Sequence, residues 1–221
     1  MGKNNYLTRE QESILAAVAQ DKKLLSQFYF TGGTALAYFY LHHRYSEDID
    51  IFSETEFDTQ YVLQFMTNYA QTHKALLNSH YVENVVYRFQ VFYPNKTELK
   101  VDFAHYPYRR IEKGNTYMKL EVDSIFDIAT NKLLTVSQRT DVKDFVDLYF
   151  LLKQDKISFW DLVRGIEVKF HQKFDPILLS GDLLKIDSFT VLPRMIIPVT
   201  LAELRVFYRE KAKELSKSFV E

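Results

Sequence analysis

The stretch from Phe28 to Ser53 constrains the fold most, because it places a glycine pair and two alternating acids at opposite ends of one apolar segment. A short aromatic run that suits a strand opens the stretch, and Gly32 and Gly33 interrupt it. Residues 34–41 are apolar enough for a buried helix, and residues 48–52 suit a second strand. The stretch therefore predicts a strand, a glycine turn, a helix and a strand.

The second strand carries two acids. Because side chains alternate along a strand, Asp48 and Asp50 share one face, with Cα atoms roughly 6 to 7 Å apart, while Ile49 and Ile51 enter the core. Two carboxylates on one face repel, which raises a pKa unless a positive group lies between them. Magnesium prefers oxygen ligands and commonly uses one or two carboxylates plus substrate phosphates. The pair therefore indicates a site for magnesium or manganese.

The glycines supply the complementary half of such a site. Gly32 and Gly33 let the backbone come close to a phosphate, and with Thr34 they leave amides at a helix start, where the helix dipole favours an anion. Each half also has a plainer interpretation, since a glycine turn is often only a tight connection and an acid pair is often a solvated strand edge. Found together, they predict a metal site facing a phosphate site.

A third acid lies further along the chain. Apolar residues alternate from Tyr81 to His105, with residues 94–96 as a turn, which predicts a β-hairpin. On its second strand Asp102 lies on the opposite face from Val101 and Phe103. Asp102 is therefore either a solvent-facing acid or a third ligand beside the first two.

The order of these features resembles a known family. A Gly-Gly pair followed after a short helix by Asp-x-Asp is similar to the first motif of the DNA polymerase beta superfamily of nucleotidyltransferases. The sequence GGTALAYFYLHHRYSEDIDIF resembles the AbiEii abortive-infection toxins more closely. This resemblance implies an α+β fold, with a polymerase-beta-like mixed sheet and flanking helices over residues 1–115. A helical domain over residues 120–221 would follow it and close the cleft.

The resemblance also implies the reaction. A nucleoside monophosphate would pass from a nucleoside triphosphate to an acceptor, with two metal ions held by Asp48, Asp50 and Asp102, which would be catalytic. RNA, first of all the 3′ end of tRNA, is the expected acceptor, and a cognate antitoxin the expected partner. Two other interpretations stay open, namely transfer to a small molecule or a protein hydroxyl, and a binding module without catalysis.

A second signature follows. The order of Lys132, Arg139, Lys143-Asp144 and Asp147-Leu148-Tyr149 resembles the toxins' arrangement of a lysine, an arginine and (R/K)-D-x-x-D-L-Y. The resemblance makes Lys132 a catalytic clamp on nucleotide phosphate, and it adds Asp144 and Asp147 to the nucleotide-binding set of Gly32, Gly33 and Thr34. Lys143 replaces a frequent arginine and lacks its bidentate geometry. Alternatively, Lys132 and the two acids form ion pairs between helices.

The segment from Tyr106 to Lys119 has a local charge of +3, from four bases less one acid, with tyrosines interleaved. Bases beside flat rings, here Arg109, Arg110 and Lys113, suit a phosphate chain with stacked nucleobases. A solvated loop between two domains is the alternative.

The amino-acid composition limits the classes of function that fit the chain. With 28 basic and 29 acidic residues among 221, the formal charge of −1 gives no general attraction to nucleic acid, so a polyanion needs a local patch. There is no cysteine, and no apolar run approaches the roughly 20 residues of a membrane span. Without an apolar signal-peptide core, a cytoplasmic protein is expected.

Overall fold

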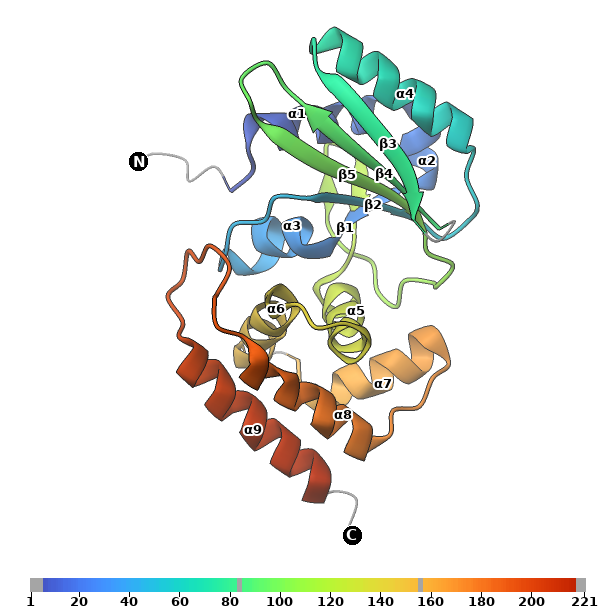
Figure 1. Ribbon diagram of the computed structural model, residues 1–221. Coiled ribbons are helices and arrows are strands. Elements are labelled where there is room, and N and C mark those ends of the chain that lie inside the picture. Colours follow the sequence, from blue (N-terminus) through green and yellow to red (C-terminus); the bar gives the residue numbers. More distant parts are fainter. Residues whose placement is uncertain (1–5, 83–84, 155–156, 218–221) are drawn as a thin grey trace. The chain divides into compact units, whose positions relative to one another are not determined.

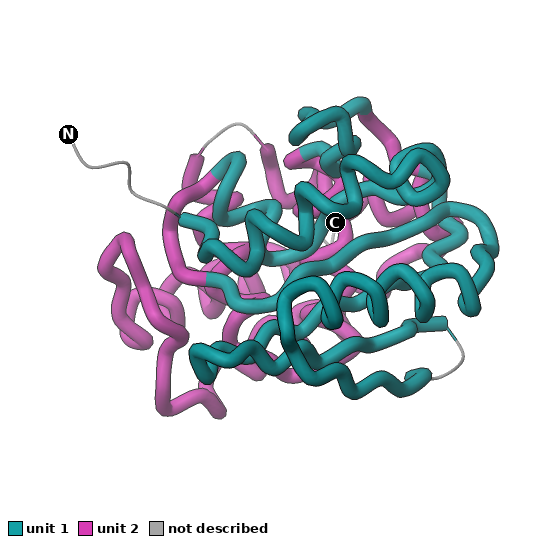
Figure 2. The backbone as a smooth tube through the Cα atoms, turned by 90° about the horizontal axis from the view of Figure 1, so that it is seen from above, with its two compact units in different colours: residues 1–40, 46–109, 113–124 teal, residues 41–45, 110–112, 125–221 magenta. Residues whose placement is uncertain are grey.

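The computed structural model describes residues 6–82, 85–154 and 157–217 of the chain. These form two compact units, which Figure 2 colours separately. The sheet unit comprises residues 1–40, 46–109 and 113–124, and the helical unit comprises residues 41–45, 110–112 and 125–221. The chain therefore enters the helical unit twice for a few residues before it stays there.

The sheet unit is built on one mixed sheet with strand order β3-β4-β5-β2-β1-β7-β6. Its strands are β1 (Tyr29–Thr31), β2 (Ile49–Ser53), β3 (Leu76–Val82), β4 (Val86–Phe92), β5 (Glu98–His105), β6 (Thr116–Tyr117) and β7 (Leu120–Val122). Two neighbouring pairs, β2 with β5 and β1 with β7, run parallel, and the other neighbours run antiparallel. This is the α+β fold with a mixed sheet that the sequence predicts.

Helices flank this sheet (Figure 1). They are α1 (Arg9–Gln20), α2 (Lys22–Gln27), α3 (Gly32–Leu36) and α4 (Thr59–Thr72). The sequence predicts the start of α1 correctly, because Thr8 and Gln11 form a capping box that satisfies two backbone donors. The side chain of Asp58 caps α4 by accepting hydrogen bonds from two backbone amides. Such caps are each worth about 1 kcal/mol.

The apolar face of the sheet packs under α4. Phe89, Val101 and Phe103 are fully buried, and the hydroxyls of Tyr69 on α4 and Tyr93 after β4 lie 2.9 Å apart. Phe89 pairs in register with Val101, so both side chains leave the sheet on the same side. The acids of β2 and β5 alternate with these residues and point to the opposite face.

The helical unit contains α5 (Ile125–Gln138), α6 (Val142–Lys153), α7 (Phe159–Phe170), α8 (Pro176–Leu183), a 3-10 helix (Leu184–Ser188) and α9 (Leu201–Lys217). Its helix starts follow the sequence signals closely. Ser158 with Asp161 forms a capping box at α7, and Thr200 with Glu203 forms one at α9. Across the described residues, no helix combines the length and the apolar character that crossing a membrane requires.

The structure differs from the sequence analysis in three places. The helix expected over residues 34–41 begins as α3 but continues from Ala37 to Leu41 as a π-helix. The sequence does not predict β3, because only Leu77 and Val82 on this strand are even partly buried and its alternation of apolar residues is weak. The segment after Tyr106, for which a solvated loop is the alternative interpretation, leads into the short hairpin of β6 and β7, which joins the sheet beside β1.

Candidate active site

The turn after β1 brings the backbone of Gly32 against the carboxylate of Asp50. Gly32 has a φ angle of +77°, in the left-handed region that glycine adopts readily and other residues avoid. A Cβ atom built on Gly32 would overlap Oδ2 of Asp50 and would lie 2.9 Å from the Cβ atom of that aspartate. Both the backbone angle and the close approach therefore require glycine at position 32.

The next two residues of the turn join the helix to the acid strand. Gly33 lies in the first turn of α3, and Thr34 is buried there. The hydroxyl of Thr34 donates a hydrogen bond to the backbone carbonyl of Asp48, directly before β2. The structure therefore places the glycine turn beside both acids of the Asp-x-Asp motif.

The third acid lies beside them across a parallel strand pair. Asp50 on β2 pairs in register with Asp102 on β5, and Asp48 lies two residues before Asp50 on the same face. Neighbouring strands are about 4.8 Å apart, so Asp50 and Asp102 leave the sheet side by side. Three acids therefore share one face of the sheet, on the side opposite α4.

Two bases on the same face bind these acids. The Nζ atom of Lys100 lies 2.7 Å from Oδ2 of Asp48. Arg88 on β4 holds Asp102 with three hydrogen bonds, from Nε to Oδ1 at 2.9 Å, from Nε to Oδ2 at 3.2 Å and from Nη2 to Oδ2 at 2.7 Å. The hydrogen bond and charge of Asp102, with the charges of Asp48 and Asp50, raise the pKa of the Arg88 guanidinium.

Arg88 and Lys100 are absent from the site that the sequence predicts. A signal was present for Lys100, which lies two residues before Asp102 and must therefore share its face of the strand. No comparable signal exists for Arg88, because its place opposite Asp102 depends on the register of β4 against β5.

The donor chemistry of this face suits a divalent cation. Carboxylate oxygens are the ligands that magnesium prefers, and three carboxylates share the face. As the side chains stand, no three histidine or acidic groups among the described residues are gathered closely enough to hold a metal ion. Asp48 and Asp102 turn towards Lys100 and Arg88, so a cation would compete with these two bases for the same oxygens.

The second predicted cluster lies within the helical unit and is buried. Lys132 on α5 places Nζ 2.7 Å from Oδ1 of Asp144 and 2.7 Å from Oδ2 of Asp147, both on α6. Arg139 binds the other oxygen of Asp144 at 2.7 Å. The charges of Asp147 and Asp144 raise the pKa of Lys132 although burial alone would lower it. The structure therefore brings Lys132, Asp144 and Asp147 together as ion pairs between helices.

A short segment from residues 41–45 completes this cluster. Arg44 binds both oxygens of Asp147, from Nε at 2.6 Å and from Nη2 at 2.8 Å. His43 lies against the same carboxylate, with Nε2 at 2.7 Å from Oδ1. Burial would raise the pKa of Asp147, but the charges of Lys132 and Arg44 hold it well below its ordinary value. Sequence reasoning missed His43 and Arg44, because nothing in their local pattern indicates a partner about a hundred residues away.

A second buried ion pair holds part of residues 106–119, here called the basic segment. Asp127 on α5 accepts hydrogen bonds from the backbone amides of Ile111 at 2.8 Å and Glu112 at 3.0 Å. Lys169 on α7 donates to the same carboxylate at 2.7 Å, and neither charged side chain is exposed. The backbone of Ile111 and Glu112 is therefore held by a buried, ion-paired carboxylate, although the side chain of Glu112 is exposed.

The tyrosines of that segment pack inside the sheet unit. The ring of Tyr106 lies 5.1 Å from that of Phe52 and 5.0 Å from that of Tyr108. The ring of Tyr117 lies 5.8 Å from that of Tyr38. All three rings are half-buried, so these contacts leave part of their surface for the stacking that the sequence suggests.

Known proteins resemble the chain along most of its length. A family model described as "Nucleotidyl transferase AbiEii toxin, Type IV TA system" matches residues 13–217. The uncharacterized protein aq_aa25 of Aquifex aeolicus is 26% identical over 219 residues, covering 94% of this chain and 97% of its own length.

Solved structures share the fold. JHP933 from Helicobacter pylori has a TM-score of 0.58 at 22% identity, covering 99% of this chain and 94% of its own. The nucleotidyltransferase toxin MenT4 from Mycobacterium tuberculosis has a TM-score of 0.54 at 20% identity, covering 93% and 84%. At these identities the likeness concerns the fold, whereas the family model spans nearly the whole chain. The chain belongs to the AbiEii family of nucleotidyl transferase toxins from type IV toxin–antitoxin systems.

Proposed function

We propose that this chain transfers a nucleoside monophosphate from a nucleoside triphosphate to an RNA hydroxyl, with the 3′ end of tRNA as the first candidate. The observation that carries the proposal is the register of Asp50 beside Asp102 on parallel strands, with the backbone of Gly32 against Asp50. Membership of the AbiEii family supports the class of reaction.

In the proposed reaction, the oxygen of the acceptor hydroxyl attacks the α-phosphorus of the triphosphate. The bond from that phosphorus to the oxygen bridging to the β-phosphorus breaks, and pyrophosphate leaves with the electron pair. The hydroxyl proton passes to a carboxylate oxygen of Asp102. Magnesium or manganese ions held by Asp48, Asp50 and Asp102 would neutralise the charge on the reacting phosphate.

The glycine turn is assigned to the triphosphate. Gly32 and Gly33 have no side chains, so phosphate oxygens can approach the backbone amides at the start of α3. The hydroxyl of Thr34 already donates to the carbonyl of Asp48, so Thr34 would contribute its amide and hold the turn against the acids.

Lys132, Asp144 and Asp147 are assigned to nucleotide binding because they match the second signature of the family. An ammonium group has three protons, and two carboxylates accept two of them from Lys132. The third proton is the one that would reach a phosphate oxygen. Asp144 and Asp147 would then orient the ammonium rather than touch the nucleotide.

Incubation with each labelled triphosphate and magnesium, and separately with total RNA, total cell protein or small hydroxyl compounds, tests the proposal. We expect label on RNA and release of pyrophosphate, and neither product with Asp50→Asn. Label on protein or on a small molecule would move the assignment to that acceptor. No transfer to any acceptor, from a folded protein that binds triphosphate, would contradict the enzymatic role.

The antitoxin is expected to be encoded with this chain, as the type IV family description suggests. Growth of cells that express the chain alone, with Asp50→Asn, or with its neighbouring gene tests this part. Both proposed substrates belong to the cytoplasm, which is where the reaction would take place.

A further inference from the structure

The sheet unit has one long strand edge. β3 stands first in the strand order, and within the part of the chain that the structure describes no strand pairs with its outer side. Figure 1 shows β3 at this edge, with α4 above it. The opposite edge is β6, which has two residues. An edge strand presents unpaired backbone donors and acceptors, which proteins normally protect with charges, proline, a bulge or shortness.

β3 has none of these protections. Its sequence LLNSHYV contains no charged residue and no proline, and it pairs with β4 over seven consecutive residues without a bulge. The side chain of Leu76 is 75% exposed and that of Tyr81 is 44% exposed. An exposed, regular and uncharged edge of this length indicates a partner strand.

The neighbouring helix is uncharged as well. α4 reads TQYVLQFMTNYAQT, and residues 59–82, which cover α4 and β3, contain a single charged residue, Lys74, although 26% of the whole chain is charged. Charged residues are depleted in the centre of protein interfaces. The helix and the strand edge therefore form one continuous surface, here called the α4–β3 surface.

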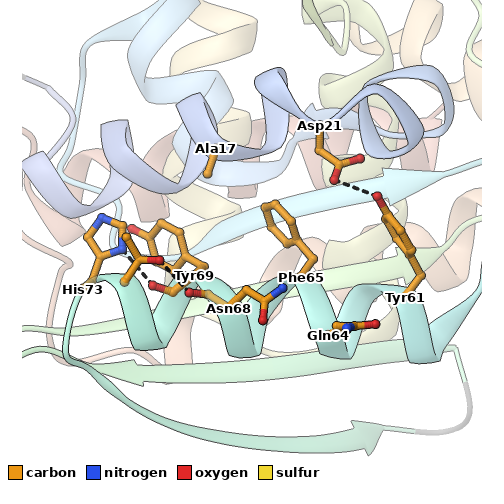
Figure 3. A pocket seen from close by; sticks show the side chains of 9 residues that line it. Ala17, Asp21, Tyr61, Gln64, Phe65, Asn68, Tyr69 and His73 are labelled. Carbon is orange, nitrogen blue, oxygen red and sulfur yellow. Dashed lines mark hydrogen bonds between the residues drawn. The ribbon is translucent and has the colours of Figure 1, made fainter.

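Figure 3 shows the side of α4 that faces α1. A pocket of about 490 Å³ lies between α1 and α4, where the rings of Tyr61, Phe65 and Tyr69 point towards α1. The amides of Gln64 and Asn68 stand beside these rings and are exposed. An amide both donates and accepts hydrogen bonds, so such a surface can bind a copy of itself.

We propose that the α4–β3 surface joins two copies of this chain across a two-fold axis, with β3 antiparallel to β3 and α4 beside α4. In a two-fold interface each element meets its own copy, so any charge near the axis would meet a like charge. Lys74 is the single charged residue within residues 59–82, so the α4–β3 surface keeps that repulsion small, and its amides can both donate and accept hydrogen bonds. Strand pairing would satisfy the open edge of both sheets at once.

The proposal predicts a dimer whose mass responds to charges placed on β3. Asn78 and His80 are exposed and share one face of β3. We expect the chain to sediment as a dimer, and the double variant Asn78→Lys with His80→Lys to sediment as a monomer, because like charges on paired strands repel. The double variant Asn78→Glu with His80→Glu should also be a monomer, and an equimolar mixture of the two variants should form a heterodimer.

The matched control is Val206→Lys on α9, a lysine placed at a 58% exposed apolar residue of the helical unit, which should leave the dimer intact. Formation of the heterodimer in the mixture shows that both variants are folded. A wild-type chain that stays monomeric over a wide concentration series overturns the proposal. So does a lysine variant that stays dimeric, or a mixture that stays monomeric.

Discussion

The Nζ atom of Lys169 lies 2.7 Å from Oδ1 of Asp127, and both side chains are fully buried. The same carboxylate holds the backbone amides of residues 111 and 112, one of the two short segments by which the chain enters the helical unit. The other segment, residues 41–45, is held by Asp147 through the side chains of His43 and Arg44, and Lys132 pairs with the same carboxylate. Each of these two short segments is therefore held by a buried aspartate that pairs with a buried lysine.

Lys169→Met should destabilise the protein strongly, by about 3–5 kcal/mol, because it leaves the buried carboxylate of Asp127 without its counter-charge. Adding Asp127→Asn to that variant should recover much of the lost stability, since neither position 127 nor position 169 then carries a buried charge. Urea unfolding of the two variants and of the wild type measures both changes.

The control for this comparison is Arg209→Ala, which breaks an ion pair with Asp187 whose side chains are 60% and 40% exposed. Such exposed pairs contribute at most about 1 kcal/mol. A Lys169→Met variant no less stable than Arg209→Ala would show that the buried pair does not hold the segment.

Stability should fall as the pH drops through about 6.5, and His43→Gln should remove much of that fall. Burial lowers the pKa of His43, outweighing the attraction of Asp147, so the folded protein keeps this imidazole neutral. The unfolded chain binds a proton near the ordinary value of 6.5, so lower pH favours unfolding. Glutamine can still donate to Asp147 but does not titrate.

Melting temperatures across the pH range test this expectation, with the exposed residue His80 changed to glutamine as the control. Asp144 and Asp147 affect stability only at lower pH. Their pKa values are lowered in the folded protein, so their contribution to stability is lost only as the pH falls below the ordinary value of 3.8. If His43→Gln and His80→Gln give the same curve as the wild type near pH 6, His43 is not the titrating group.

Gly32→Ala should abolish transfer activity and destabilise the protein. Position 32 has a left-handed backbone angle, which alanine adopts only with strain, and the added Cβ atom would overlap the carboxylate of Asp50. Gly181→Ala is the control, because a Cβ atom there meets nothing within 4 Å and alanine should stabilise α8 by roughly 0.5–1 kcal/mol. Transfer assays and thermal unfolding of both variants give the test, and a fully active Gly32→Ala would refute the assigned role of the turn.

Local signals in the sequence predict much of the sheet unit. The Asp-x-Asp strand and the hairpin around Asp102 follow from alternation of apolar residues, and the helix starts follow from capping residues. The partners of the acids do not follow, because Arg88 reaches Asp102 through strand register and Arg44 reaches Asp147 through tertiary packing. Both depend on contacts between residues distant in the chain, which no local pattern encodes.

Arg88→Ala should strengthen binding of manganese to the protein, because Arg88 occupies both carboxylate oxygens of Asp102 that a cation would use. Asp102→Asn should weaken the same binding and lower transfer roughly 10²–10³-fold, the usual cost of losing one electrostatic catalytic group. Titration followed by the paramagnetic signal of manganese measures affinity without any turnover. Unchanged affinity in both variants would place the cation elsewhere.

The basic segment should bind the RNA backbone. Arg109 and Lys113 are exposed and flank Ile111 and Glu112, whose backbone amides Asp127 binds. Changing Arg109, Arg110 and Lys113 to alanine should weaken RNA binding and reduce the slope of log affinity against log salt by roughly one unit for each phosphate that the protein no longer neutralises. The choice of triphosphate should not change, because the proposal assigns the triphosphate to the glycine turn and Lys132 rather than to this segment.

The control removes the same charge elsewhere, by changing Arg209, Lys211 and Lys213 of α9 to alanine. Both triple variants lose three positive charges, so a general effect of net charge would weaken RNA binding equally in the two. A specific contact would instead lower affinity and salt slope only in the basic-segment variant, while transfer to a minimal acceptor stays intact. If the α9 variant loses as much affinity and slope as the basic-segment variant, the RNA is held by overall charge and not by this segment.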